Sequence, residues 1–343
     1  MNAERLGLKV LPHLLGSDQD AYQENLRQSY DDGVPHVVPR LVVLVLQENC
    51  NVSCVYCPYV TDAVHAVKPY AKTAQWKTTL DQLAAFGVRH VRFSGGEPTL
   101  RRDLVELTAH AASAGLQTAM VSNGLRLTRA LGEALVSAGL GAMTLSIDSF
   151  DRKTYEYVRQ SPYDRMLEAV EVARHMRAFQ PRFWIGVNCV VTKHNIATIP
   201  ALVDELSARE IPIQFMPVHN FAGDENAIHM PDLSSMQALV AQLLEQKHAG
   251  RMINSSEQYL QGMVDFIRTG SLPEDFECSA GYLQVIIDPD LGLRPCCLLA
   301  PAASLATSSL ADAWQSPEMA KARRQIKDHK CPRCWLMYVD SWK

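Results

Sequence analysis

The chain has 343 residues, of which 47% are hydrophobic, enough to bury a sizeable core in one large domain or in one domain with a small appendage. Lys and Arg total 33 and Asp and Glu total 37, so the formal net charge is −4, and no concentrated basic patch indicates a nucleic-acid partner. The longest aliphatic run, Leu41–Leu46, is far shorter than the roughly 20 residues of a membrane span, so we expect no membrane association.

The N-terminus and the cysteine count indicate a cellular compartment. Residues Met1–Arg5 do not begin a long apolar stretch of the kind found in secretion signals, so we expect a cytoplasmic protein. The cytoplasm is reducing, and the nine cysteines therefore favour metal binding or catalysis over a disulfide framework.

Residues 1–39 are polar and predict a short helical lead-in, after which apolar runs alternate with amphipathic stretches. The predicted strands are Leu41–Gln47, Val88–Ser94, Gln117–Ser122, Ala142–Asp148, Phe183–Val191 and Ile211–Pro217. The predicted helices between them include Arg102–Ala114, Leu131–Ala138, Met166–Phe179 and Ile199–Ala208. Six β-then-α units predict an α/β fold with a parallel sheet, a partial (β/α)6 TIM-like barrel over residues 40–218.

The pattern changes after residue 218. Helical periodicity near Leu233–Lys247 and Glu257–Arg268 predicts a helical linker over residues 219–275. Residues 276–343 are rich in cysteine and predict a small C-terminal domain with a hairpin and a helix near Ser316–Lys327.

Three cysteines, Cys50, Cys54 and Cys57, follow the first predicted strand. The carboxyl ends of barrel strands meet at one mouth, where α/β barrels carry their chemistry. Three thiolates in an eight-residue loop can hold three irons of a cubane cluster and leave the fourth iron open for another ligand. The alternatives are a zinc site that takes one distant ligand, or three structural cysteines.

This loop resembles the CxxxCxxC motif of the radical S-adenosylmethionine (SAM) superfamily, with the sequence Cys50-Asn51-Val52-Ser53-Cys54-Val55-Tyr56-Cys57. The resemblance covers about residues 40–218. It implies that Cys50, Cys54 and Cys57 are the catalytic ligands of a [4Fe–4S] cluster. The open iron of that cluster would bind SAM and cleave it to a 5′-deoxyadenosyl radical. The resemblance also places Tyr56 near the adenine of SAM.

Gly95, Gly96 and Glu97 end the second predicted strand. Adjacent glycines let a backbone approach a ligand without a Cβ clash. The resemblance implies that this GGE segment binds the methionyl amine of SAM. The alternative is an ordinary turn with a solvated Glu97. Ser122 and Asn123 end the third strand, where the family has a similar segment near the cofactor, although Asn-Gly is also a common turn signal.

Ser146, Asp148 and Arg159 resemble the SxDS…R pattern of molybdopterin-precursor cyclases and their relatives. In those proteins the serine and the arginine contact SAM, the arginine through the SAM carboxylate, a pairing that suits a guanidinium group. Gln160 departs from the pattern because glycine often follows the arginine. The alternative for Arg159 is a plain position on a surface helix.

Two later strands add cofactor-binding candidates. Asn188 and Cys189 point to opposite faces of the fifth strand, so one of them is expected to face the barrel interior. We assign Asn188 to the cofactor; Cys189 is a buried structural residue or, alternatively, a hydrogen-atom donor. Met216, near the end of the sixth strand, lies near the adenine in related enzymes, and core packing is the alternative.

The tail carries five further cysteines: Cys278, Cys296, Cys297, Cys331 and Cys334. Four thiolates from three segments suit either a second [4Fe–4S] cluster or a zinc ribbon. The tail resembles the SPASM/twitch subgroup of the superfamily, which implies one auxiliary [4Fe–4S] cluster held by Cys278, Cys296, Cys331 and Cys334. Pro295 favours Cys296 over its neighbour Cys297, which stays open as a ligand.

The resemblance implies a radical SAM oxidoreductase or lyase that takes electrons from a flavodoxin- or ferredoxin-type donor. Only 49 residues precede Cys50, fewer than a peptide-binding or cobalamin domain needs. We therefore expect a small polar metabolite as substrate, such as a sugar, aminocyclitol or nucleoside-like intermediate, and dehydrogenation, epimerisation, elimination or decarboxylation as the reaction. The alternatives are a peptide maturase that forms a crosslink or oxidation, and a zinc-binding scaffold without a redox role.

Overall fold

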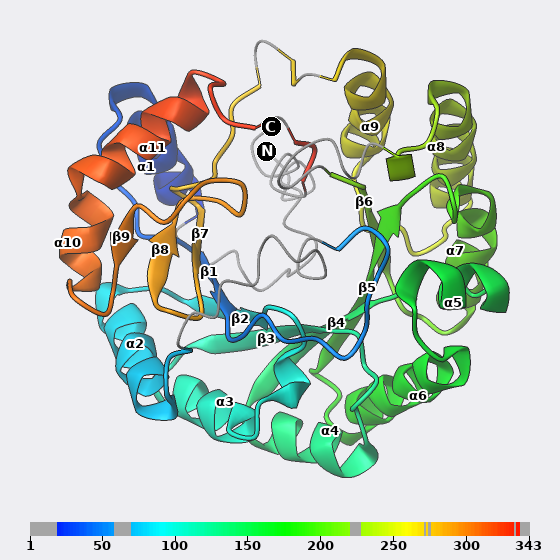
Figure 1. The fold of residues 1–343 in the computed structure, drawn as a ribbon, viewed down its shortest axis with the longest axis horizontal. Coiled ribbons are helices and arrows are strands. Elements are labelled where there is room, and N and C mark those ends of the chain that lie inside the picture. Colours follow the sequence, from blue (N-terminus) through cyan, green and yellow to red (C-terminus); the bar gives the residue numbers. More distant parts are fainter. Residues whose placement is uncertain are drawn as a thin grey trace.

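The computed structural model describes residues 19–57, 70–219, 228–270, 272–273, 276–332 and 334–336. A nine-stranded sheet with the order β6-β5-β4-β3-β2-β1-β7-β8-β9 forms its centre (Figure 1). The strands are β1 Leu41–Val45, β2 His90–Ser94, β3 Gln117–Ser122, β4 Leu140–Ser146, β5 Trp184–Val191, β6 Ile213–Pro217, β7 Gln284–Ile287, β8 Gly292–Arg294 and β9 Ala303–Ser304. The α-helices are α1 Gln19–Asp32, α2 Thr73–Phe86, α3 Leu104–Ser113, α4 Arg129–Ser137, α5 Arg152–Arg159, α6 Tyr163–Phe179, α7 Ile199–Ala208, α8 Leu233–His248, α9 Glu257–Thr269, α10 Leu310–Gln315 and α11 Pro317–Lys327.

Strands β1 to β6 are all parallel, each paired with the next, and the helices lie around the outside of the curved sheet (Figure 1). Alternate strand residues such as Leu44 and Phe93 are fully buried against helix residues such as Leu80 in the main core. The residues between them face the barrel interior, because successive strand side chains point to opposite faces. The predicted α/β fold with a partial (β/α)6 barrel is confirmed.

The first strand of the tail joins the barrel sheet. β7 pairs with β1 in parallel, with Leu41 beside Gln284 and Leu44 beside Ile287. β8 and β9 then continue the sheet in antiparallel order, which gives the predicted hairpin. The proposed division of the chain near residues 39, 218 and 275 stays a prediction.

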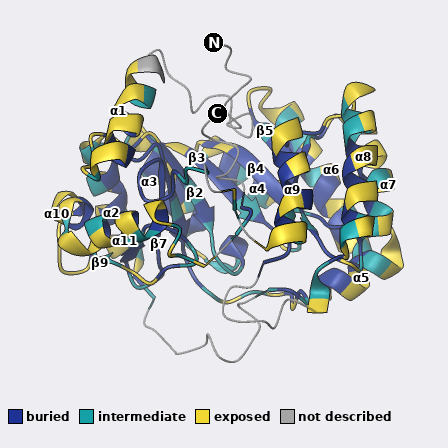
Figure 2. Cartoon of the chain, turned by 90° about the horizontal axis from the view of Figure 1, so that it is seen from above, coloured by how far each residue is buried: buried dark blue, intermediate teal, exposed yellow. Residues whose placement is uncertain are grey.

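The lead-in helix α1 packs on the tail. Leu26 and Tyr30 form a small core with Tyr282 and Leu283, and the Lys327 ammonium donates to the carbonyl of Tyr30 at 2.8 Å. Burial is concentrated on the strands and on the inward faces of the helices, whose outer faces are exposed (Figure 2). Within the described ranges, no helix has both the length and the apolar character needed to cross a membrane.

Candidate active site and second cysteine site

The loop that carries Cys50 lies directly on the two glycines at the end of β2. The backbone N–H of Gly96 donates to the carbonyl of Gln47 at 2.8 Å, and that of Glu97 donates to Asn49 at 2.9 Å. A Cβ atom at Gly95 would lie 2.3 Å from the Gln47 carbonyl oxygen, and one at Gly96 would lie 2.2 Å from that of Asn49. The glycines are therefore required for the chain before Cys50 to approach β2, whatever ligand also binds there.

Glu97 is fully buried and links the ends of β2 and β3. Its carboxylate accepts hydrogen bonds from the Ser122 hydroxyl and the Asn123 backbone N–H, both at 2.8 Å, and from Thr99. Burial raises the pKa of Glu97, and the hydrogen bonds from these residues act in the opposite direction. The solvated Glu97 of the ordinary-turn alternative is wrong, and its role toward a methionyl amine stays a prediction.

Asn123 connects this cluster to the cysteine loop. Its side-chain amide donates to Asn51 Oδ1 at 2.8 Å and lies 3.7 Å from the sulfur of Cys50. Asn123 is therefore a turn residue that also supplies an N–H donor to one of the three sulfurs.

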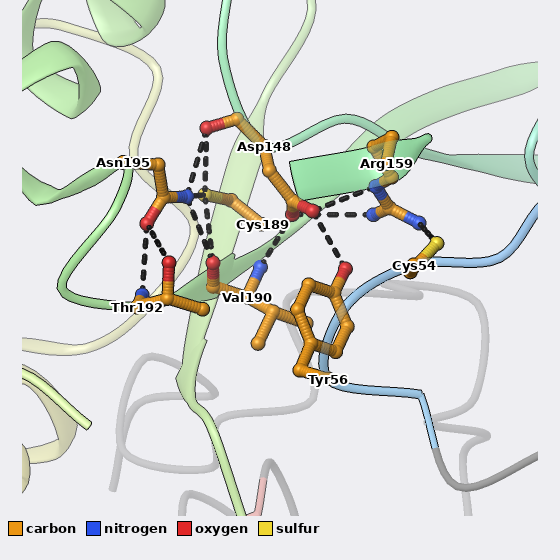
Figure 3. Close-up of polar contacts among 8 residues, drawn as sticks. All are labelled: Cys54, Tyr56, Asp148, Arg159, Cys189, Val190, Thr192 and Asn195. Atoms are coloured by element: carbon orange, nitrogen blue, oxygen red, sulfur yellow. Dashed lines mark hydrogen bonds and ion pairs between the residues drawn. The ribbon is translucent and has the colours of Figure 1, made fainter. Parts of the chain in front are cut away.

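A second buried carboxylate, Asp148, lies just beyond β4 and binds the other side of the cysteine loop (Figure 3). It accepts a hydrogen bond from the Tyr56 hydroxyl at 2.6 Å and one from the backbone N–H of Val190 at 2.8 Å. Arg159 contacts the same carboxylate through Nη2 at 3.1 Å and through Nε at 2.6 Å. Asp148 thus joins β4, β5, α5 and the cysteine loop at one point.

Arg159 is buried and reaches from Asp148 to the cysteine loop. Its Nη1 lies 3.7 Å from the sulfur of Cys54 (Figure 3). Burial alone would lower the pKa of Arg159, but the negative charges around it, Asp148 first, raise it well above its ordinary value. The guanidinium therefore keeps its charge beside the thiol. Its burial excludes the surface-helix alternative, and a contact with the SAM carboxylate stays a prediction.

Gln160 follows Arg159 in a left-handed backbone conformation, with φ of 50°. Its N–H bonds to the Glu156 carbonyl and ends α5. This conformation favours glycine, which explains why the related pattern has glycine there. Here the geometry is kept with a glutamine.

The surroundings of the Cys50 and Cys54 sulfurs fit a metal that deprotonates the thiols. Burial raises the pKa of the Cys50 and Cys54 thiols, while Arg159 acts to lower that of Cys54. A coordinating metal removes such protons, and N–H donors to the sulfurs are typical of iron–sulfur sites. Among the residues that the structure describes, no group of three or more His, Cys, Asp or Glu side chains is already arranged around a metal position. The fit therefore depends on the loop, its spacing and its donors.

Polar side chains form a row across the inner faces of β4, β5 and β6. Ser146 pairs with Asn188, and Asn188 pairs with Gln214, whose amide donates to Asn188 Oδ1. The Oε1 atom of Gln214 is buried without a hydrogen-bond partner among the described residues. Met216, two residues further along β6, is on the same face and partly exposed.

Cys189 lies on the opposite face from Asn188. It is fully buried in the main core, and its sulfur lies 3.7 Å from the Asn195 amide, which also donates to the Asp148 carbonyl (Figure 3). Cys189 is therefore a structural residue that does not face the barrel interior.

Four tail thiols line one small cavity. The cavity is lined by Cys278, Cys296, Cys331 and Cys334, together with apolar side chains that include Phe276 and Ile326. Burial raises the pKa of Cys278 to about 12 and raises that of Cys334 as well. A hydrogen bond from Cys297 lowers the pKa of Cys296 to about 7. Cys297 does not line this cavity.

A larger cavity of about 810 Å³ opens at the other end of the barrel. Its walls come from the start of several strands and include His90, Gln117 and Trp184. It contains none of the residues predicted for the site, which gather at the carboxyl ends of the strands.

The sequence patterns missed several buried residues around the two sites. Gln214 had a usable signal, because it shares the inner face of β6 with Met216. Asn195 had none, since it lies in a loop beyond β5. His219 and Trp335, which bond to each other at 2.6 Å, lie too far apart in the chain for any local pattern to pair them.

Two regions of the chain match known protein families. Residues 44–206 match the radical SAM superfamily, whose members bind SAM and a [4Fe–4S] cluster. Residues 278–335 match the SPASM iron–sulfur cluster-binding domain, which implies an auxiliary cluster.

Curated relatives are similar over much of the chain. The PqqA peptide cyclase of Bradyrhizobium diazoefficiens is 28% identical over 237 residues, which are 67% of this chain and 58% of that protein. The PqqA peptide cyclase of Rhodopseudomonas palustris is 26% identical over 323 residues, 88% and 81% of the two chains. A probable GTP 3′,8-cyclase of Methanopyrus kandleri is 34% identical over 173 residues, 50% and 54%. The match to the first relative thus spans less than two thirds of its length.

Solved structures share the fold. SuiB of Streptococcus suis, bound to the precursor peptide SuiA, has a TM-score of 0.70 at 17% identity and covers 94% of this chain and 75% of its own. Native anSMEcpe with bound AdoMet has a TM-score of 0.67 at 14% identity, with 83% of each chain covered. The chain belongs to the radical SAM superfamily and carries a C-terminal SPASM domain.

Proposed function

We propose that the chain is a radical SAM enzyme that modifies a peptide. In this proposal Cys50, Cys54 and Cys57 hold the [4Fe–4S] cluster that binds SAM. When bound, that cluster would supply the electron for reductive cleavage of SAM, and with it the chemistry that removes a hydrogen atom from the substrate. The observation that supports this assignment is the buried donor set around the loop, with Asn123 beside Cys50 and Arg159 beside Cys54.

The chain's own residues position this site. Asp148 anchors Tyr56 and Arg159, and so fixes the loop between Cys54 and Cys57. The residues proposed to contact SAM line the strand ends around the loop: Tyr56, Gly95, Gly96, Glu97, Ser122, Asn123, Ser146, Asp148, Arg159, Asn188 and Met216.

The auxiliary [4Fe–4S] cluster is assigned to Cys278, Cys296, Cys331 and Cys334. Their shared cavity supports this set, and it supports Cys296 rather than Cys297. A cluster held by these four thiolates would suit electron transfer from a substrate radical.

The peptide substrate is supported by the relatives. Two of those described above are named PqqA peptide cyclases, and one of them matches 88% of this chain. SuiB, which shares the fold, was solved with a precursor peptide. These findings favour the peptide maturase over the small polar metabolite. We propose crosslinking or oxidation of a peptide, with a flavodoxin- or ferredoxin-type protein as electron donor.

The radical chemistry is tested with protein purified without oxygen. We expect about eight irons per chain, four for each cubane, and 5′-deoxyadenosine after addition of SAM and dithionite. Reduced flavodoxin should replace dithionite. A colourless zinc protein that forms no 5′-deoxyadenosine would contradict the proposal.

The substrate class is tested separately. Short peptides encoded beside the gene are incubated with the enzyme, SAM and reductant, and the products are examined by mass spectrometry. A crosslink or oxidation removes two hydrogen atoms from the peptide, and the Cys54→Ala variant should not produce this loss. Turnover of sugars or aminocyclitols but of no peptide would return the assignment to a small metabolite.

A further inference from the structure

His219 lies just beyond β6 at the mouth of the barrel and is buried. Its Nε2 accepts a hydrogen bond of 2.6 Å from the backbone N–H of Trp335. Trp335 directly follows Cys334, so this bond connects the end of the sixth barrel strand to the segment that carries a proposed cluster ligand.

The Trp335 side chain is fixed by α9 on its other side. Its indole N–H donates to the Tyr259 carbonyl at 3.0 Å, and the Tyr259 hydroxyl donates to the Trp335 carbonyl at 3.1 Å. The ring lies against Gly262 so closely that a Cβ atom there would lie 1.9 Å from the ring atom Cζ2. A rigid, buried ring cannot yield to such a contact as a flexible side chain would.

An aromatic ring also bridges the two partners of the hydrogen bond. Phe266, on α9, stacks on His219 with ring centroids 5.7 Å apart and on Trp335 with centroids 6.4 Å apart. His219, Trp335 and α9 therefore contact one another through hydrogen bonds and through packing.

We propose that His219, Tyr259, Gly262 and Trp335 form a joint that positions Cys334, and with it the auxiliary cluster, relative to the barrel mouth. His219 and Trp335 are positioning residues in this joint. The proposal rests on the ligand set proposed above, which includes Cys334.

The protonation state of His219 is consistent with this role. Burial lowers its pKa to about 4, so the imidazole is neutral at physiological pH and can accept the Trp335 hydrogen bond. A charged imidazole has no free acceptor.

The first test replaces Gly262 with Ala, and the matched control replaces Gln261, exposed on the same helix, with Ala. Both are made in a chain that also carries Cys50→Ala, Cys54→Ala and Cys57→Ala, so that only the auxiliary cluster is loaded. We expect Gly262→Ala to lose most of the remaining four irons or to change the electron paramagnetic resonance spectrum of the reduced cluster, and Gln261→Ala to change neither. An unchanged spectrum at full iron content in Gly262→Ala would overturn the joint.

A second pair of variants keeps the test decisive if Gly262→Ala does not fold. His219→Gln retains an acceptor near the position of Nε2, whereas His219→Ala removes it. We expect His219→Ala to shift the reduction potential and spectrum of the auxiliary cluster, and His219→Gln to restore both. Identical wild-type behaviour of the two variants overturns the role of His219. If Cys334→Ala itself keeps the auxiliary cluster, the ligand set fails instead, a result distinct from failure of the joint.

Discussion

The two cysteine groups are held by different surroundings. Cys50 and Cys54 lie among charged and polar partners, where Asn123 and Arg159 approach the sulfurs and buried Asp148 fixes Arg159. The tail cysteines come from three segments and lie among apolar side chains such as Ile326, with aromatic packing at one end.

This difference suggests a division of roles. Donors and charges beside a cluster tune its electronic properties and leave room for a polar ligand, whereas an apolar enclosure isolates a cluster that binds no small molecule. We therefore expect the first site to depend on a buried ion pair, and the second to depend on apolar packing within the tail.

The largest effect is expected on iron content, which should distinguish the two cysteine sites. Cys54→Ala should lose about half of the roughly eight irons and all 5′-deoxyadenosine formation. Cys334→Ala should lose the other half and keep SAM cleavage, because the first loop does not need the tail thiols. Iron analysis and chromatography of the products measure both; equal loss of SAM cleavage in the two variants would break the comparison.

The next test concerns the choice between adjacent thiols. Cys296→Ser should lose the auxiliary cluster, because Cys296 lines the shared cavity. Cys297→Ser should keep it and serves as the matched control. The reverse result, read from iron content and the absorbance near 400 nm, would move the ligand to Cys297.

Removal of the buried charge should destabilise the first site strongly. Asp148→Asn leaves Arg159 buried without its counter-ion, which costs about 3–5 kcal/mol of unfolding free energy. Asp164→Asn breaks an exposed ion pair with Arg152 and should change stability little. Urea unfolding measures both, and equal stability of the two variants would show that the Asp148 pair is not a structural requirement.

We expect acid to lower the free energy of unfolding through the protonation of His219, next to the second site. Its native pKa of about 4 lies below the ordinary 6.5, so between these values the unfolded chain binds a proton that the native chain does not. Stability is therefore unaffected above pH 6.5 and falls as the pH drops toward 4, by about 2 kcal/mol at pH 5. His219→Gln, which does not titrate, should lose less stability than the wild type between pH 7 and pH 5 in urea unfolding. Parallel losses in the two proteins would exclude His219 as the source.

The smallest effect is expected at Tyr56. Tyr56→Phe removes one hydrogen bond to a carboxylate that keeps its contacts with Arg159 and Val190, a loss of about 1.5 kcal/mol. Iron content should stay at the wild-type level. A loss as large as that of Asp148→Asn would mean that the hydroxyl, rather than the ion pair, holds the loop.

Much of the fold could be predicted from hydrophobic periodicity. The bounds of β3 and α7 agree with the predicted Gln117–Ser122 and Ile199–Ala208. Helix α5 was not predicted, because it is short and mostly polar, with few buried side chains. The pairing of β7 with β1 also could not be predicted, since hydrogen bonds between distant strands leave no local pattern.

The candidate site likewise has parts that could be predicted from the sequence and parts that could not. The cysteine spacing and the Gly95-Gly96-Glu97 segment are local, and they led to the correct strand ends. The sequence pattern also identified Asp148 and Arg159, but not the contacts that they make. The ion pair between them and the hydrogen bond from Tyr56, 92 residues before Asp148, are seen only when the strands and the cysteine loop are brought together.

The parallel pairing of β7 with β1 ties the tail to the strand that leads into Cys50. A chain truncated before β7 would expose the outer edge of β1 as a row of unsatisfied backbone N–H and C=O groups. Bare edges of this kind recruit other strands and promote aggregation. The tail thus acts as an edge cover for the barrel, so removing it would endanger solubility even in an experiment that concerns only the first cluster.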